Sequence, residues 1–153
     1  MSAFQLPLWT YPTVVIGAGL AALWRGREEE RLGAFTMLAA WAVTMVVYRT
    51  GSRDTQWGIF AVDTVQFVVF VWLSMKTRRY WPLFAAGFGL LQVVTHGAKT
   101  LDTGISAWAY ITAQIIWSYL ILFTIIYASL SAPRRYAEIE AMPAIDPPGA
   151  TRR

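Results

Sequence analysis

The chain has 153 residues, of which 56% are hydrophobic, 15% aromatic and 14% charged, and its formal net charge is +4. Soluble domains carry about 25% charged residues, so this composition argues against an ordinary soluble domain and favours an integral membrane protein. The sequence has no cysteine, which excludes disulfides, thiolate metal sites, covalent haem attachment and thiol chemistry.

Five apolar stretches follow one another along the chain, separated by short charged loops, a pattern typical of proteins that cross the membrane several times. Each stretch has about 17–24 residues, which at 1.5 Å per residue approaches the roughly 30 Å hydrocarbon core of a bilayer. We therefore expect an all-α fold, an integral membrane bundle of five transmembrane helices within residues 1–132. The predicted spans are 6–24, 32–48, 57–75, 81–98 and 107–130.

Residues 14–23 of the first stretch, VVIGAGLAAL, match the glycine-rich turn that binds the pyrophosphate of a dinucleotide. That motif needs a strand–turn–helix unit and an acidic residue about 20 positions further on. Here the next stretch is itself a predicted span, and no acidic residue stands at that distance. We interpret the glycines as part of a small-residue face for close helix packing in lipid. The residues expected to serve such packing are Gly17, Gly19, Ala85, Gly89 and Gly97.

Basic residues are distributed unevenly between the loops. The first and third loops and the start of the tail carry eight near the predicted spans, and the second and fourth loops carry three. Because positive residues stay in the cytoplasm, this predicts an outside N-terminus and a cytoplasmic C-terminus. We expect Pro133 to end the fifth helix and residues 133–153 to form a basic, mostly disordered cytoplasmic tail. The expected partners are the anionic inner leaflet and other membrane subunits or a second copy, and not nucleic acid.

Polar side chains recur at helical spacing within the third, fourth and fifth stretches. In each stretch they are three or four residues apart and so share one helix face. In the predicted orientation all of them lie within about 3–13 Å of the outer boundary, so the three faces should meet there. The candidates for a ligand or proton site are Asp63, Gln66, Gln92, His96, Gln114 and Tyr110, with Ser118 on the same face.

Three interpretations of this group remain open. Its members could be interhelical hydrogen bonds worth about 0.6 kcal/mol each, an outward-facing pocket for a proton, polar ligand or quinone-like headgroup, or part of a site completed by another subunit. An Asp inside a membrane costs about 2.5–3.5 kcal/mol, so Asp63 is neutral, functional, or paired with His96, Lys99 or Arg53. A single histidine cannot form a bis-His haem site, and zinc would lack ligands, so we expect no metal and no cofactor.

The segment RRYWPLFAAGFGLLQVVTHGAKTLDTGISAWAYITAQIIWSYLILF and the earlier loop GREEERLGA resemble a family of small polytopic integral membrane proteins of alphaproteobacteria. The resemblance covers most of residues 20–130 and is one of overall pattern. It implies the bacterial cytoplasmic (inner) membrane as the location, and it implies no particular activity.

The sequence favours a small non-catalytic integral membrane protein, an accessory or assembly subunit of a larger membrane complex or a small binding module. The alternative is a homo-oligomeric proton-coupled carrier or channel in which Asp63, with His96, is the protonatable site. A third possibility is a membrane enzyme acting on a lipid or quinone at the outer face, although no catalytic constellation supports it.

Overall fold

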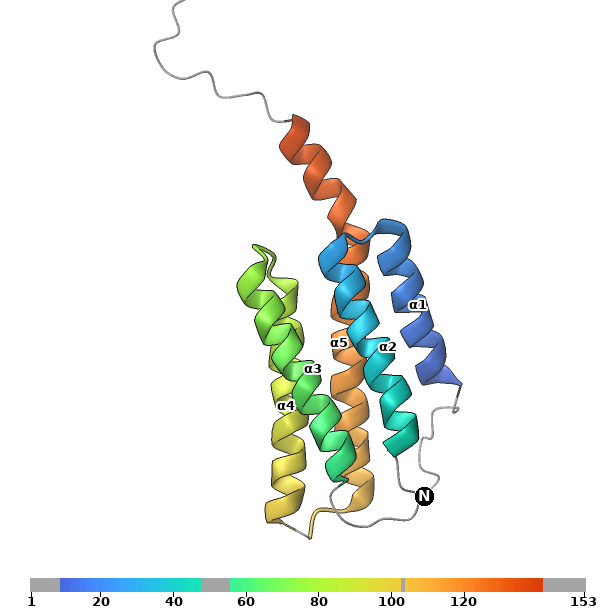
Figure 1. The fold of residues 1–153 in the computed structure, drawn as a ribbon, viewed down its shortest axis with the longest axis vertical. Coiled ribbons are helices and arrows are strands. Elements are labelled where there is room, and N and C mark those ends of the chain that lie inside the picture. The colour runs from blue at the N-terminus through green and yellow to red at the C-terminus, as the bar shows by residue number, and fades with distance from the viewer. Residues whose placement is uncertain (1–8, 48–55, 103, 142–153) are drawn as a thin grey trace, which may run out of the picture.

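The computed structural model describes residues 9–47, 56–102 and 104–141, and the side chains of these residues up to Ser131. All regular structure in these ranges is α-helical, and the helices lie side by side as a bundle (Figure 1). The predicted all-α fold is therefore confirmed for this part of the chain. The helices are α1 (Thr10–Arg25), α2 (Glu28–Val47), α3 (Trp57–Lys76), α4 (Trp81–Leu101) and α5 (Ala107–Ala141).

Three of the five helices are long and apolar enough to cross a membrane: α2, α3 and the Ala107–Ser131 part of α5. The prediction of five such helices is thus shown only in part. Helix α1 has 16 residues, about 24 Å, and the start of its predicted span at residues 6–8 lies outside the described residues, as does Tyr48 at the end of the second span. Helix α4 is long enough, but Gln92 and His96 lower its mean hydropathy.

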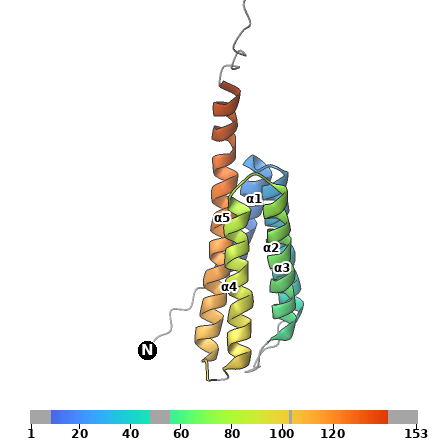
Figure 2. The same cartoon turned by 90° about the vertical axis from the view of Figure 1, so that its left-hand side faces the viewer.

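Helix α5 contacts three of the other helices. It packs against α1, α2 and α4, while α3 packs along α4 and α2 lies against both α1 and α3. Its C-terminal part extends well beyond the ends of the other helices (Figure 2). The core consists of aliphatic and small side chains with a few larger ones, among them Val15, Ala18, Ala22, Met37, Phe70, Leu73, Ala85, Ile121, Leu122 and Ile125.

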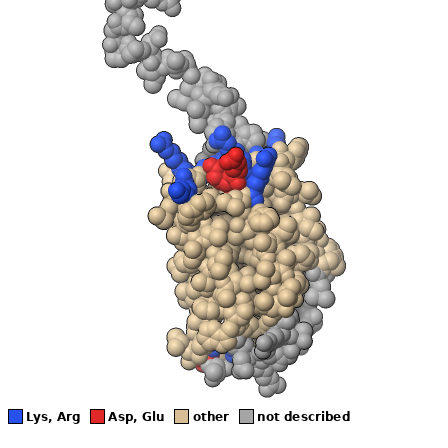
Figure 3. Space-filling view, viewed as in Figure 1, with Lys and Arg blue, Asp and Glu red and all other residues tan. Residues whose placement is uncertain are grey.

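The flank of the bundle is apolar and exposed. In the view of Figure 3, most of the charged side chains gather at the end where α1 joins α2 and α3 joins α4, and the surface below them is uncharged. A soluble monomer rarely exposes a continuous apolar surface, so this flank is compatible with contact with lipid. The exposed large side chains include Leu20, Trp24, Val46, Phe84, Leu90 and Phe123.

At the charged end of the bundle, Glu30 connects two segments of the chain, and its side chain is completely buried. One of its carboxylate oxygens pairs with Arg79, just before α4, and the other accepts a hydrogen bond from the backbone N–H of Arg27 at 2.8 Å. A glutamate in the first turn that bonds back to the chain before its helix is a known N-terminal cap. One side chain thereby joins the α1–α2 connection to the start of α4.

The small residues differ in what they contact within the bundle. A Cβ at Gly17, Gly19 or Gly97 would meet no described atom within 4 Å, so a packing role for these three toward another chain stays a prediction. Helix α1 instead packs through Val15, Ala18 and Ala22, because this i, i+3, i+7 row faces the core. Ala85 is fully buried, and a Cβ at Gly89 would lie 3.4 Å from the Cα of Phe67.

Pro133 does not end α5, which continues to Ala141; that prediction was wrong. A proline inside a helix removes one backbone hydrogen bond and crowds the preceding turn, which weakens or bends a helix without necessarily ending it. The first part of the predicted tail is therefore helical, and residues 142–153 lie outside the described residues.

Candidate functional site

Helices α3, α4 and α5 bring the six candidate residues and Ser118 together at their interface, toward the end of the bundle where α4 joins α5. We call this set the polar ladder: Asp63, Gln66, Gln92, His96, Tyr110, Gln114 and Ser118. The four members on α3 and α4 are buried, with exposed fractions between 1% and 7%. The three members on α5 are partly buried.

One rung of the ladder joins Asp63, His96 and Tyr110 in a line. The Oδ2 of Asp63 lies 2.9 Å from Nε2 of His96, and the hydroxyl oxygen of Tyr110 lies 2.7 Å from Nδ1 of the same ring. Each helix contributes one member, so the imidazole connects α3 to α5 through α4. The ring of Phe60 meets the imidazole edge-on, with ring centroids 5.4 Å apart, and covers it with an apolar side chain.

Two patterns of protons satisfy this rung when Asp63 is ionised. The carboxylate can only accept, so Nε2–H of His96 donates to it in both. In a neutral ring Nδ1 is an acceptor and the Tyr110 hydroxyl donates to it, whereas in a protonated ring Nδ1–H donates to the hydroxyl oxygen. The sequence left His96, Lys99 and Arg53 as possible partners of Asp63. The structure pairs it with His96, while Lys99 Nζ donates to the carbonyl of Ile105 at 2.7 Å and Arg53 lies outside the described residues.

The second rung consists of amides and a hydroxyl. Gln66 Nε2 donates to Oε1 of Gln92 at 3.2 Å, and Gln92 Nε2 donates to Oγ of Ser118 at 3.0 Å. Gln114 Nε2 makes a long contact of 3.5 Å with the backbone carbonyl of Gln92, and its Oε1 is a buried acceptor without a partner among the described atoms. The amide of Gln92 is thus the centre of this rung, with one helix on either side.

The layers next to the second rung are apolar. The next layers toward the charged end contain Phe70, Leu73, Ala86, Leu122 and Ile125, all buried. The ladder therefore occupies one half of the bundle. In the described part of the chain no three His, Asp or Glu side chains lie close enough to hold a metal ion.

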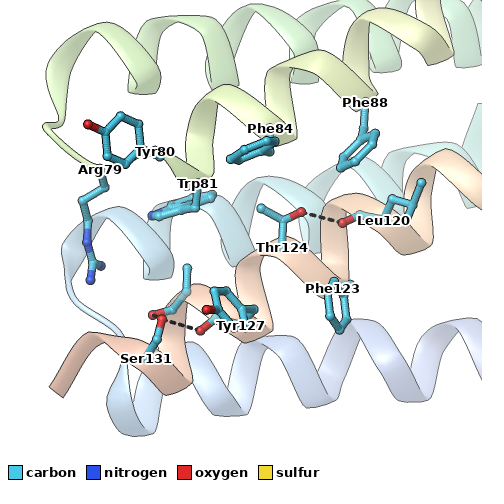
Figure 4. A pocket seen from close by; sticks show the side chains of 11 residues that line it. Arg79, Tyr80, Trp81, Phe84, Phe88, Leu120, Phe123, Thr124, Tyr127 and Ser131 are labelled. Carbon is cyan, nitrogen blue, oxygen red and sulfur yellow. Dashed lines mark hydrogen bonds between the residues drawn. The ribbon is translucent and has the colours of Figure 1, made fainter. Parts of the chain in front are cut away.

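A feature that sequence analysis missed lies at the charged end, between α4 and α5. A groove of about 580 Å³ is bordered there by aromatic side chains from both helices (Figure 4). Its lining includes Trp81 and Ala128, which are buried, and Arg79 lies at one end. In the sequence these aromatics resemble the usual membrane-interface belt, so they gave no signal of a common groove. The aromatic members are Tyr80, Trp81, Phe84, Phe88, Phe123 and Tyr127.

Comparison of the chain with protein-family models, with curated proteins and with solved structures gave no match.

Proposed function

We propose that all five helices lie in a bacterial inner membrane, with the N-terminus outside and the C-terminus in the cytoplasm. The exposed apolar flank supports membrane insertion, and the basic residues of the first and third loops support the orientation. Although α1 and α4 are less apolar or shorter than typical spans, both pack along the length of α5. Polar residues of α4 face protein, where hydrogen bonds offset the cost of placing them in lipid.

Within that membrane, we propose that the protein is a small non-catalytic accessory or assembly subunit. The observation that carries this proposal is that the polar groups of the ladder bond mainly to one another. A binding or catalytic site usually presents polar groups to a ligand, whereas these groups hold three helices in register. The exposed aromatic groove and the projecting end of α5 are surfaces that a partner could contact.

The chemistry of the ladder suits a register lock. An ionised carboxylate is costly to bury, and removing its partner leaves that cost without compensation. Sliding α4 by one residue would move both Gln92 and His96 away from their partners, since residues that share a helix face are three or four apart. The pair Asp63–His96 then favours the single register of α3 and α4 in which the two side chains are in contact. It does so even though each hydrogen bond contributes only about 0.6 kcal/mol.

The alternative function is a proton-coupled carrier or channel. The rung Asp63–His96–Tyr110 favours it, because an imidazole can accept a proton at one nitrogen and release one at the other. The amide and hydroxyl rung and the apolar layers that follow it would have to be bypassed through an oligomer or a second conformation. We rank this function second for that reason.

Substitution of Asp63 by Asn separates the two functions. The accessory-subunit proposal predicts that D63N lowers thermal stability in detergent and leaves proton flux into proteoliposomes at the level of the wild type. The carrier predicts a folded D63N protein whose flux is lost. Asp102→Asn is the matched control, because Asp102 is an exposed residue beyond the end of α4 whose carboxylate, among the described residues, accepts a hydrogen bond from the backbone N–H of Gly104.

A further inference from the structure

We propose that the groove between α4 and α5 binds one anionic phospholipid, with an acyl chain along its aromatic walls and the phosphate at the Arg79 end. This inference depends on the proposed membrane location but not on the accessory role. The groove's volume of about 580 Å³ lies within the 300–1,000 Å³ typical of small-molecule sites.

The walls of the groove suit an apolar chain. Phe84 and Phe88 of α4 face Phe123 of α5 across it (Figure 4), and the lining also includes the small side chain of Ala128. Phe84 and Phe123 are about two-thirds exposed, so apolar surface is available on both sides. An acyl chain in this position would pack against these rings by van der Waals contact and would need no polar contact along its length.

A buried polar atom in the groove indicates that the ligand also carries a hydrogen-bond acceptor. The indole nitrogen of Trp81 is buried and has no hydrogen-bond partner among the described atoms, although Trp81 forms part of the groove. A buried N–H without an acceptor is unfavourable, and buried Trp nitrogens usually have a partner. The ester carbonyl of a phospholipid is an acceptor placed between headgroup and chain. A carbonyl at the Arg79 end of the groove would offer this nitrogen the acceptor that it lacks.

The charge of the residues around the groove favours an anionic lipid headgroup. The groove opens at the end of the bundle that carries six basic residues in the two connections, against three glutamates. One of those glutamates, Glu30, is buried and paired with Arg79, so it is not presented to a ligand. Exposed Lys76 and Arg78 stand next to the start of α4, where the groove begins. A phosphate there meets a positive potential, which favours an anionic lipid over a zwitterionic one.

The test is native mass spectrometry of the full chain after delipidation in detergent, titrated with phosphatidylglycerol or phosphatidylcholine. We expect one phosphatidylglycerol per chain, bound at least fivefold more tightly than phosphatidylcholine. Trp81→Phe, which keeps an aromatic ring and removes the indole N–H donor, should weaken binding about fivefold. Thr124→Phe, which fills the groove, should weaken it at least tenfold.

Thr13→Phe is the matched control. Thr13 and Thr124 both donate to the carbonyl four residues earlier in their helix, but Thr13 is exposed on α1, far from the groove. Binding by T124F or W81F equal to that of T13F would overturn the inference, and so would equal binding of the two lipids. Competition by inorganic phosphate alone, or a dimer that T124F dissociates, would replace the lipid by a free anion or a second copy.

Membrane insertion is scored first, by resistance of the wild-type protein to alkaline carbonate extraction. A chain that carbonate removes would contradict the proposed membrane location. An inserted chain that holds no lipid would contradict only this inference. If T124F fails to fold, as circular dichroism would show, W81F still decides.

Discussion

Glu30 illustrates how one residue can hold two connections together. Its carboxylate is buried between the N–H of Arg27 and the side chain of Arg79. Removing one partner of a buried ion pair typically costs 3–5 kcal/mol, because the other charge remains without compensation. Arg79 retains some exposure, so we expect Glu30→Ala to lower the free energy of unfolding by about 3 kcal/mol, at the low end of that range.

The control for this prediction is a substitution of Glu28, two residues before Glu30. Glu28 is exposed in the same first turn of α2, and Glu28→Ala should change stability by less than about 0.5 kcal/mol. Denaturant titration of both variants in the same detergent gives the comparison. Equal losses for the two variants would mean that Glu30 acts only through the charge of the helix terminus.

The bond between Asp63 and His96 makes a second prediction at the residue scale. If the pair is a register lock, Asp63→Asn and His96→Phe should not be additive, because each single change already breaks the same interaction. We expect a coupling energy of roughly 0.6–1.7 kcal/mol, the range for interhelical hydrogen bonds in membranes. Unfolding of the two single variants and the double variant measures it. Additive effects would show that the 2.9 Å contact contributes nothing to stability.

At the scale of the helices, two glycines should respond in opposite ways. A Cβ on Gly33 of α2 would lie 2.7 Å from Cη2 of the buried Trp81, which cannot shift without disturbing the start of α4. Gly33→Ala should therefore destabilise the protein by about 1–3 kcal/mol. A Cβ on Gly17 of α1 meets nothing within 4 Å, so Gly17→Ala should stabilise it by up to about 1 kcal/mol through helix propensity.

Thermal unfolding of both variants in detergent, followed by circular dichroism, provides the measurement. The stability of the Gly17→Ala variant also tests whether the small residues of VVIGAGLAAL serve close helix packing. A marked loss of stability in G17A would mean that Gly17 lies at a close contact that the single chain does not show.

Features that follow from residue spacing within one helix could be predicted from the sequence, whereas contacts between residues far apart in the chain could not. The pairing of Gln92 with Gln66 and of His96 with Asp63 follows from polar residues repeated on one face of each helix, so the meeting of three faces could be expected. The bond between Glu30 and Arg79 could not, because the two residues are 49 positions apart and both look like ordinary loop charges. The end of α5 was misjudged because a proline inside a helix weakens or bends it without necessarily ending it.

For the whole molecule, orientation is the property that the charge distribution predicts most simply. The chain has no cysteine, so single cysteines can report on each end of the bundle without background. A membrane-impermeant maleimide should label Leu101→Cys from the periplasm of intact cells. It should label Lys76→Cys only after the cells are opened, since α3 and α4 run in opposite directions between these exposed positions. The reverse pattern would invert the predicted topology.

The central claim is that this chain is a non-catalytic subunit whose polar ladder serves its own fold. The most direct measurement is the mass and composition of the tagged wild-type protein, extracted in native membrane nanodiscs. The account predicts particles that contain other membrane proteins in fixed stoichiometry with this chain, and the same composition for Asp102→Asn. A closed homo-oligomer without other proteins, combined with proton flux that Asp63→Asn abolishes, would contradict it and assign the ladder to transport.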